Sequence, residues 1–228
     1  MVIPQASPVK GVPPAPPSDR PPAPPEAWND PSSAPPDAWN DVEPDRGWST
    51  LSAAAKHERI LCAAGRLFAG EGLDASMPAV AALAGASIGS LYRQFPSKRE
   101  LLAALVVRRL EQIEQAAIEA AARESNHWQA LKEMLWATVE RSAADDFLGD
   151  AWTLVEDHEH VQVAAARVYA AIGRLLEHAR TEGDLRADAT AMDIRLLFVA
   201  TRASRQVSPD AWRRTLALMI DGLAAKRP

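Results

Sequence analysis

The sequence has little cysteine and no long apolar run. Its single cysteine, Cys62, excludes an intramolecular disulfide framework and any metal site built from several thiolates. Because Cys62 lies in the apolar helical pattern ILCAAGRLF, we expect a buried, unreactive thiol. The longest apolar run, LLAALVV, is far shorter than the ~20 residues that a membrane-spanning helix needs.

Signals for export and for catalysis are also missing. The first residues, MVIPQASPVKG, lack the apolar segment of a signal peptide, so we expect a cytoplasmic protein with no membrane partner. Without a glycine-rich phosphate loop, a nucleophile elbow or a recognisable pairing of histidine with cysteine, we expect neither enzyme activity nor a cofactor. The segment EDHEH, residues 156–160, has metal-ligand residue types but no histidine pair four residues apart. We interpret it as a solvated charged corner rather than a metal site.

Proline is concentrated at one end of the chain. Of 18 prolines, 14 lie in residues 1–47. Because proline removes backbone donors and blocks regular structure, we expect these residues to form a disordered tail. The tail contains PPEAWND at 24–30 and PPDAWND at 35–41. This repeat is either duplicated low-complexity sequence or a short linear motif in which Trp28 and Trp39 anchor a partner.

Charge divides the chain into three parts. Residues 1–47 carry 3 basic and 7 acidic side chains, residues 48–110 carry 8 and 4, and residues 111–228 carry 14 and 19. The net charge of the whole chain is −5, yet the middle part is basic. A basic segment between two acidic ones indicates a polyanionic partner for the middle part alone.

From Leu51 onward the pattern is helical almost throughout. Ala, Leu, Arg and Glu dominate, proline nearly disappears and no strand-like alternation occurs. We expect Ser97 and Glu100 to form a capping box, and Pro209 behind Ser208 to open the last helix. Start and stop residues thus predict an all-α fold with helices at residues 51–70, 77–84, 88–95, 98–123, 127–143, 147–157, 160–181, 188–205 and 209–225.

Residues 76–95, SMPAVAALAGASIGSLYRQF, have the spacing of a helix-turn-helix unit. Ala81 is small where a second helix must cross closely, and Gly85 follows where the turn needs a positive φ. Leu91 and Phe95 lie four residues apart, and we expect both to point inward. The second helix of this unit is expected to enter a DNA major groove, which is ~12 Å wide.

The region 56–105 resembles the DNA-binding domain of TetR-family transcriptional regulators. The residues that carry the resemblance are Ile60, Ala63, Ala64, Leu67, Phe68, Gly72, Ala81, Ala84, Gly85, Ser87, Gly89, Leu91, Tyr92, Phe95, Lys98, Leu101 and Leu102. The resemblance implies a homodimer that places two recognition helices on a palindromic double-stranded DNA operator. It also implies a helical C-terminal domain that binds a small-molecule effector.

We expect the DNA contacts to come from Ser76, Ser87, Ile88, Gly89, Ser90, Tyr92, Arg93 and Lys98. The resemblance implies phosphate or base contacts for the three serines, Tyr92 and Lys98. Gly89 and Ser90 are small enough to allow close approach of the nucleic acid. Ile88 departs from the family, which often has a basic or polar residue there. Its side chain either contacts a thymine methyl group or simply packs.

The C-terminal half resembles the family in layout, and its last two helices loosely resemble the SbtR-like group. Such helices usually form a four-helix dimer interface, and their apolar stripes fit that role. Intramolecular core is the alternative for the same residues. The stripes are Ile194, Leu197, Phe198 and Thr201 on one helix, and Trp212, Leu216, Met219, Ile220 and Leu223 on the other.

Aromatic residues on the central helices predict an effector pocket within residues 127–205. The candidate lining residues are Met134, Trp136, Phe147, Trp152, Tyr169 and Arg174. The apolar members would enclose a small molecule, and Arg174 would meet an anionic ligand. The alternatives are core packing for the apolar members and a surface or salt-bridged position for Arg174.

Together these inferences predict a disordered tail at 1–47, a three-helix helix-turn-helix DNA-binding domain at 48–105, and a helical effector-binding and dimerisation domain at 106–228. The function that they indicate is a transcriptional regulator, a repressor that an apolar or amphipathic effector releases from its operator. The alternative is a helical scaffold protein that recruits a partner through its tryptophan repeats.

Overall fold

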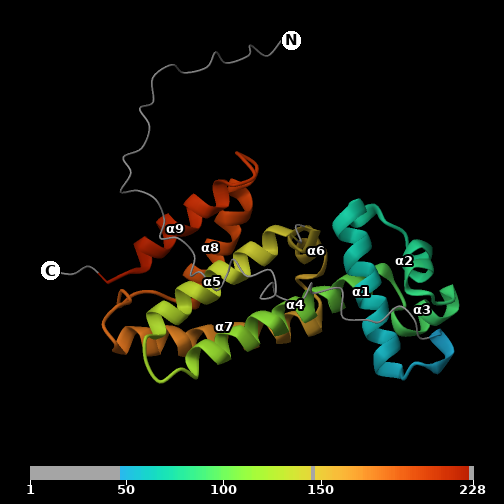
Figure 1. Ribbon diagram of the computed structural model, residues 1–228, viewed down its shortest axis with the longest axis horizontal. Helices are drawn as coiled ribbons and strands as arrows, with labels where there is room; N and C mark the ends of the chain where they lie inside the picture. Colours follow the sequence, from blue (N-terminus) through green and yellow to red (C-terminus); the bar gives the residue numbers. More distant parts are fainter. Residues whose placement is uncertain (1–46, 145–146, 226–228) are drawn as a thin grey trace, which may run out of the picture. The chain divides into compact units, whose positions relative to one another are not determined.

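The computed structural model describes residues 47–144 and 147–225 (Figure 1). Within these ranges the chain is helical with no strand, which confirms the all-α prediction. The predicted tail lies outside the described residues, apart from Gly47. The helices are α1 (Ala53–Glu71), α2 (Met77–Ala84), α3 (Ile88–Gln94), α4 (Lys98–Ala121), α5 (His127–Ala144), α6 (Phe147–Val155), α7 (Glu159–Thr181), α8 (Ala191–Ser204) and α9 (Ala211–Leu223), with short 3-10 helices η3 (Trp48–Thr50) and η4 (Gly72–Asp74).

Each of the first four helices begins after a serine. The Ser52 and Ser76 hydroxyls accept a hydrogen bond from the backbone N–H three residues further on, at 3.1 and 3.3 Å. Ser87 and Ser97 cap α3 and α4 in the same way. A hydroxyl at this position satisfies an N–H that has no partner inside the helix, which explains why these starts were readable from the sequence.

The expected capping box at Ser97 is only half formed. Ser97 caps α4, but the Glu100 carboxylate lies 3.1 Å from Nε2 of His158 instead of returning to the cap. A helix-start carboxylate does fold back at α8, where Asp193 accepts bonds from the N–H and the hydroxyl of Thr190, at 2.7 and 2.8 Å. Glu100 therefore forms the tertiary contact with His158 in place of the local bond that would complete the capping box.

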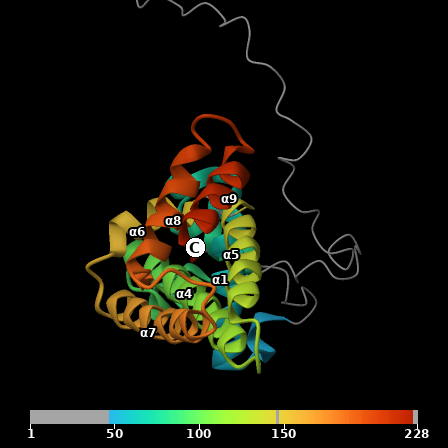
Figure 2. The same cartoon turned by 90° about the vertical axis from the view of Figure 1, so that its left-hand side faces the viewer.

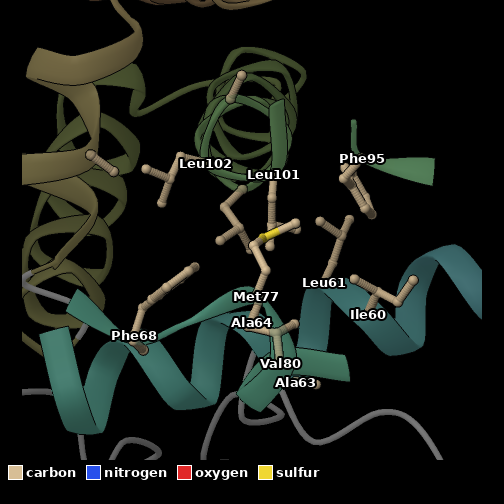
Figure 3. Packing of buried hydrophobic residues seen from close by; sticks show 14 of the residues in the cluster. Ile60, Leu61, Ala63, Ala64, Phe68, Met77, Val80, Phe95, Leu101 and Leu102 are labelled. Carbon is tan, nitrogen blue, oxygen red and sulfur yellow. The ribbon is translucent and has the colours of Figure 1, made fainter. Parts of the chain in front are cut away.

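The hydrophobic cluster around α1, α2, α3 and the first half of α4 is called the head core below (Figure 3). Figure 3 shows the side chains of Met77, Leu101 and Leu102 directed into the space between α1 and α4. Small residues close the remaining gaps, because Ala64 and Ala81 are buried where helices cross. The core holds the short helices α2 and α3, which have little apolar surface of their own.

Helix α6 belongs to the head core although it lies far along the chain. Phe147, Ala151 and Val155 recur every four residues and are all buried. The Phe147 ring lies 5.9 Å from the Phe68 ring of α1, measured between centroids. Residues four apart share one face of a helix, so the other face of α6 is available for different contacts.

The second hydrophobic cluster, called the body core, combines the second half of α4 with α5, α7, α8 and α9. Helix α4 packs most extensively against α7, and Figures 1 and 2 both show the two helices side by side. The 24 residues of α4 contribute to both cores. This helix is therefore continuous from the head core into the body core.

The apolar stripes of α8 and α9 do not form a surface for a partner. Seven of the nine residues are at most 8% exposed within the single chain: Ile194, Leu197, Thr201, Trp212, Leu216, Ile220 and Leu223. The other two, Phe198 and Met219, pack against the body core. For the seven buried residues the assignment to a dimer interface is wrong, and the alternative, intramolecular core, is confirmed. The last helix also starts later than expected, since Pro209 and Asp210 form a turn before Ala211.

The Cys62 side chain is buried, as predicted. Its sulfur lies 3.7 Å from Nη1 of Arg108. Among the helices that the structure describes, none is long and apolar enough to cross a membrane.

Candidate nucleic-acid interface and body cavity

The turn between α2 and α3 fixes how the two helices cross. Gly85 adopts the left-handed conformation, with φ 66° and ψ 27°, as its spacing predicted. Its N–H bonds back to the carbonyls of Ala81 and Ala82 and so closes α2. A side chain at this φ would be strained, so the turn requires glycine. Beyond the turn, Leu91 and Phe95 are buried in the head core, as expected.

The outward face of α3 carries a branched apolar side chain and a phenol. Ile88 and Tyr92 lie four residues apart and are 43% and 45% exposed. Within the described chain neither residue belongs to the head core or the body core. Ile88 thus lies outside both cores, and its contact with a base stays a prediction. An exposed apolar group at the start of such a helix suits the methyl group of thymine in a major groove.

Hydrogen bonds link Ser87, Ser90 and Arg93 along one side of α3. The Ser87 hydroxyl accepts from the Ser90 N–H at 3.1 Å, and the two hydroxyl oxygens are 2.8 Å apart. Arg93 Nη2 donates to the Ser90 hydroxyl at 3.1 Å. A guanidinium has five N–H donors, so this bond orients Arg93 and leaves most donors for an anion such as phosphate.

Lys98 is partly buried at the start of α4. Its Nζ donates to the Leu73 carbonyl oxygen and lies 5.6 Å from the centre of the Phe68 ring. An ammonium group has three donors, so this contact holds the charge in place and leaves two donors for a phosphate. Ser76, the other expected contact outside α3, is exposed at the start of α2, where it caps the Ala79 N–H.

Gly89 is not required by the fold of α3. Inside a helix, glycine is less favourable than alanine by ~1 kcal/mol. A Cβ added at Gly89 would meet no atom within 4 Å, so the neighbouring residues do not exclude a side chain. The missing side chain is therefore best explained by something that approaches α3 from outside.

A cavity of about 700 Å³ lies among the helices of the body. This volume falls in the range of ~300–1,000 Å³ that small-molecule sites occupy. Helices α4 to α9 all contribute to its wall, which is mostly apolar. Representative lining residues are Val106, Ile113, Val139, Val168, Ile194 and Phe198.

Two of the six expected pocket residues, Trp152 and Tyr169, line this cavity. Both contact Arg195 of α8. Arg195 Nη1 donates to the Tyr169 hydroxyl oxygen at 3.1 Å, and the guanidinium carbon lies 5.6 Å from the centre of the Trp152 ring. The structure thus joins a tryptophan of α6, a tyrosine of α7 and an arginine of α8 in one cluster.

The other four expected residues lie elsewhere. Met134 and Trp136 of α5 pack in the body core, where the Trp136 and Trp212 ring centres are 6.0 Å apart. Phe147 is in the head core, and Arg174 is exposed on α7, outside the cavity wall. The core alternative therefore describes the first three residues, and the surface alternative describes Arg174.

Sequence reasoning missed four arginines in the cavity wall, Arg109, Arg195, Arg202 and Arg205. The sequence contains a signal that could have identified two of them, Arg195 and Arg202. Arg195, Phe198 and Arg202 recur at the spacing of one helical face, so a basic stripe on α8 could have been read beside the apolar one.

The EDHEH segment packs on the first turn of α4. His158 is mostly buried beside Glu100, and Arg99 Nη2 lies 2.6 Å from Oδ1 of Asp157. Arg99 Nε also donates to the Leu154 carbonyl at 3.3 Å. The interpretation as a fully solvated corner is therefore wrong for His158. Within the described ranges, no three His, Cys, Asp or Glu side chains are grouped so that they could hold a metal ion.

These features define a helix-turn-helix DNA-binding protein with a second, hollow helical part. Residues 60–105 match the tetR family of bacterial regulatory proteins, and residues 128–225 match the C-terminal domain of SbtR-like transcriptional regulators. The chain belongs to the TetR family of transcriptional regulators. Members of this family are generally DNA-binding regulators rather than enzymes.

Solved structures of other TetR regulators share the fold. SCO0520 of Streptomyces coelicolor is 26% identical, with a TM-score of 0.57 over 75% of this chain and 99% of that one. A regulator from Mycobacterium vanbaalenii is 31% identical, with a TM-score of 0.56 over 75% and 97%. SmeT, the repressor of the Stenotrophomonas maltophilia efflux pump SmeDEF, is 22% identical, with a TM-score of 0.55 over 74% and 90%, a likeness of fold alone. No curated protein matches the sequence.

Proposed function

We propose that this protein is a transcriptional repressor, a homodimer that binds a palindromic double-stranded DNA operator and that a small apolar or amphipathic effector releases. In this proposal residues 48–105 form the DNA-binding domain, and residues 106–228 form the effector-binding and dimerisation domain. The observation that carries the proposal is the position of α6, because this helix packs in the head core and its residues Leu148 and Trp152 also line the cavity.

The proposed DNA contacts come from α3 and the residues that flank it. Helix α3 would lie in the major groove with its exposed side chains toward the bases, while hydroxyl and cationic groups contact the phosphates. Support comes from the exposure of Ile88 and Tyr92 and from the open space at Gly89. The full set is Ser76, Ser87, Ile88, Gly89, Ser90, Tyr92, Arg93 and Lys98.

The proposed dimer interface is an exposed apolar stripe on α8. Met192, Leu196 and Val199 share one helical face, and each is a little more than half exposed. Leu218 of α9 is also about half exposed. Burial of this surface against its two-fold copy would contribute ~25 cal/mol for each Å² removed from water. Two-fold symmetry would then place the two α3 helices on half-sites ~34–36 Å apart.

Release by an effector requires a path from the cavity to α3, and α6 supplies one. Phe147 and Val155 are buried in the head core, and Leu148 and Trp152, which also contact this core, line the cavity. A ligand that fills the cavity would press on α6, and the contact between Phe147 and Phe68 would carry the displacement to α1.

Polar contacts tie the same region to the first turn of α4. Arg99 binds the Leu154 carbonyl and Asp157, and Glu100 binds His158. A shift of α6 would therefore also move the start of α4, next to Lys98. Because two recognition helices must keep a fixed separation on DNA, a small shift would break the register. The coupling between effector and operator would be reciprocal and is typically ~1–3 kcal/mol.

Selection of bound duplexes from random DNA, followed by fluorescence anisotropy on the enriched sequence, tests this proposal. We expect a two-fold symmetric site whose affinity falls steeply with salt, because phosphate contacts release counterions. Lys98→Ala should weaken binding and flatten the salt dependence. Arg174→Ala removes an exposed arginine of the body and should change neither the operator affinity nor its salt dependence. Failure to enrich any duplex, or equal weakening by both substitutions, would contradict the proposal.

The alternative function, a scaffold that uses the tryptophan repeats, is not favoured by the family assignment. The repeats themselves lie outside the described residues. We propose that the repressor keeps its operator affinity when it starts at Gly47, because all proposed DNA contacts lie after that residue. Loss of operator binding by this shortened protein would give the tail a role in DNA recognition.

A further inference from the structure

The cavity also indicates the chemistry of its ligand. We propose that the effector is an amphipathic carboxylate, whose anionic head binds Arg195 at the edge of the cavity and whose apolar body lies between α4 and α8. This inference rests on the proposed function and specifies the ligand class of the same cavity.

The charged residues of the cavity wall are mostly of one sign. Four arginines and one acidic residue, Glu156, contribute to it. The rest of the wall is largely apolar, so the surroundings screen charge less than water does. An excess of positive charge in such surroundings favours an anion.

Three of the four arginines hold the walls together. Arg109 Nη2 donates to the Ser142 hydroxyl at 2.8 Å and so joins α4 to α5. Arg202 Nη2 lies 2.6 Å from Oδ1 of Asp150 and joins α8 to α6. Arg205 Nη1 donates to the Ser142 carbonyl at 3.2 Å. The main role of these three side chains is therefore to fix the helices around the cavity.

Arg195 has a different environment. Its contacts within the described part of the chain are the Tyr169 hydroxyl, at 3.1 Å, and the face of the Trp152 ring, at 5.6 Å. Both partners are uncharged, so they orient the guanidinium without neutralising it. The remaining N–H donors are available for a carboxylate, whose two oxygens match the fork of a guanidinium.

Tyr169 would complete the anion site. Its oxygen accepts the bond from Arg195, so its own O–H can be donated to the same carboxylate. Behind this polar pair the wall is apolar, with Ile113, Val168 and Phe198. A head group at the edge and an apolar body behind it would satisfy both parts of the site. An anion at the edge also keeps part of its hydration, which lowers the cost of binding.

Isothermal titration of the full chain with three compounds that share a twelve-carbon body tests the inference. Dodecanoate, 1-dodecanol and dodecyltrimethylammonium, used below their aggregation limits, differ in the charge of the head group. We expect dodecanoate to bind about 10- to 100-fold more tightly than dodecanol, as charge-assisted hydrogen bonds allow. The ammonium compound should bind most weakly, whereas its binding would dominate if Glu156 set the preference.

Substitutions locate the head-group contact. Arg195→Ala should reduce dodecanoate affinity to that of dodecanol and leave dodecanol binding unchanged. Tyr169→Phe should cause a smaller loss, and Arg195→Glu should transfer the preference to the ammonium compound. Arg174→Ala is the matched control, because this arginine is exposed on α7 outside the cavity wall, and it should bind all three compounds as the wild type does.

The outcomes separate the ligand class from the proposed function. Three results would overturn the inference. They are unchanged dodecanoate binding by Arg195→Ala, tightest binding of the ammonium compound, and no binding of any of the three compounds. Anisotropy of the operator complex gives the second readout. If dodecanoate binds through Arg195 but leaves the operator complex intact, the ligand class stands and release by this ligand fails. If another compound releases the operator while dodecanoate does not bind, the proposed function stands and the ligand class fails.

Discussion

The head core and the body core differ in how fully they are packed. In the head core, buried alanines such as Ala64 and Ala81 let helices approach closely. Beside the body core lies a cavity of about 700 Å³, whose wall also includes Val106 and Leu148 of the head core. Empty volume forfeits dispersion contacts and lowers stability, whereas close packing gives a rigid element. The proposed ligand site thus lies in the less densely packed part of the chain, and α3 projects from the closely packed part.

The largest expected effect separates the interior of the body from its surface. On α8, Leu197 is 0% exposed and its neighbour Leu196 is 53% exposed. Leu197→Glu should unfold the protein, because an unpaired buried charge costs at least ~4–5 kcal/mol. Leu196→Glu should leave the fold intact and convert the proposed dimer to a monomer.

Circular dichroism melting and sedimentation equilibrium distinguish these two results. A folded Leu197→Glu protein would contradict the burial of that residue. A Leu196→Glu protein that stays dimeric at micromolar concentration would place the interface elsewhere.

Adding the same apolar volume to each region compares the two cores directly. Ala64 is fully buried in the head core, and Ala165 of α7 lines the cavity. Ala64→Leu should destabilise the protein by ~1–3 kcal/mol through overpacking. Ala165→Leu should leave stability unchanged or raise it by up to ~1 kcal/mol, because a new side chain can occupy empty space. Urea unfolding measures both, and equal destabilisation by the two substitutions would remove the contrast between a packed head and a hollow body.

Substitution by alanine should change the stability of the protein in opposite directions at two glycines of the head. Gly89→Ala should raise stability by ~0.5–1 kcal/mol, because alanine is the better helix former and its Cβ has open space. The same substitution should weaken operator binding in anisotropy measurements. Gly85→Ala should instead lower stability by ~1–2 kcal/mol, because φ is 66° there. Unchanged operator affinity for Gly89→Ala would show that DNA does not approach this position closely.

The smallest expected effect concerns how the two regions cap their helices. The head uses serine hydroxyls, whereas in the body the Glu182 carboxylate accepts the His127 N–H at 2.8 Å and lies 2.7 Å from Nδ1 of the same residue. The hydrogen bond from the His127 side chain, followed by that from its backbone, lowers the pKa of Glu182 below its usual 4.5. A carboxylate whose pKa falls on folding stabilises the protein above the unfolded-state pKa and loses this effect as the pH falls through the folded-state value.

Melting temperatures of Glu182→Gln and the wild type, compared across pH, check this contribution. We expect a slightly lower melting temperature for the variant near neutral pH and no difference well below pH ~4. Glu124→Gln, at an exposed position between α4 and α5, is the control and should show no pH-dependent difference. A gap between Glu182→Gln and the wild type that persists in acid would assign the effect to packing instead of charge.

The head could be predicted from the sequence because its determinants are local. Ser87 and Ser97 mark helix starts through bonds that span three residues. Gly85 marks a turn because glycine adopts the left-handed conformation at less cost than residues with a side chain. The spacing from Ala81 to Leu91 then fixes which side of α3 is buried. Two residues of this region could not be predicted in this way. Ile88 is exposed outside both cores, and Glu100 contacts His158, which lies far along the chain.

The cavity could be predicted only in part because six helices build it. Trp136 and Trp152 look equally suitable in the sequence, yet Trp136 packs against Trp212 and Trp152 lines the cavity. The difference arises from the rotation of α5 and α6 about their axes, which distant residues decide. Phe147 shows the same effect, because its partner Phe68 lies on α1. Helical periodicity identifies a face but not what that face will meet.

The outward face of α3 can change without loss of stability, whereas the buried residues of the cavity wall cannot. Ile88 and Tyr92 belong to neither core, so substitutions there alter what the protein recognises and leave its packing intact. Ile194 and Trp212, by contrast, line the cavity and are also buried in the body core. After a gene duplication, two copies of this chain would therefore diverge readily in the DNA sequence that they bind. Changes of ligand that involve such buried residues would come more slowly, because each step would also have to repair the body core.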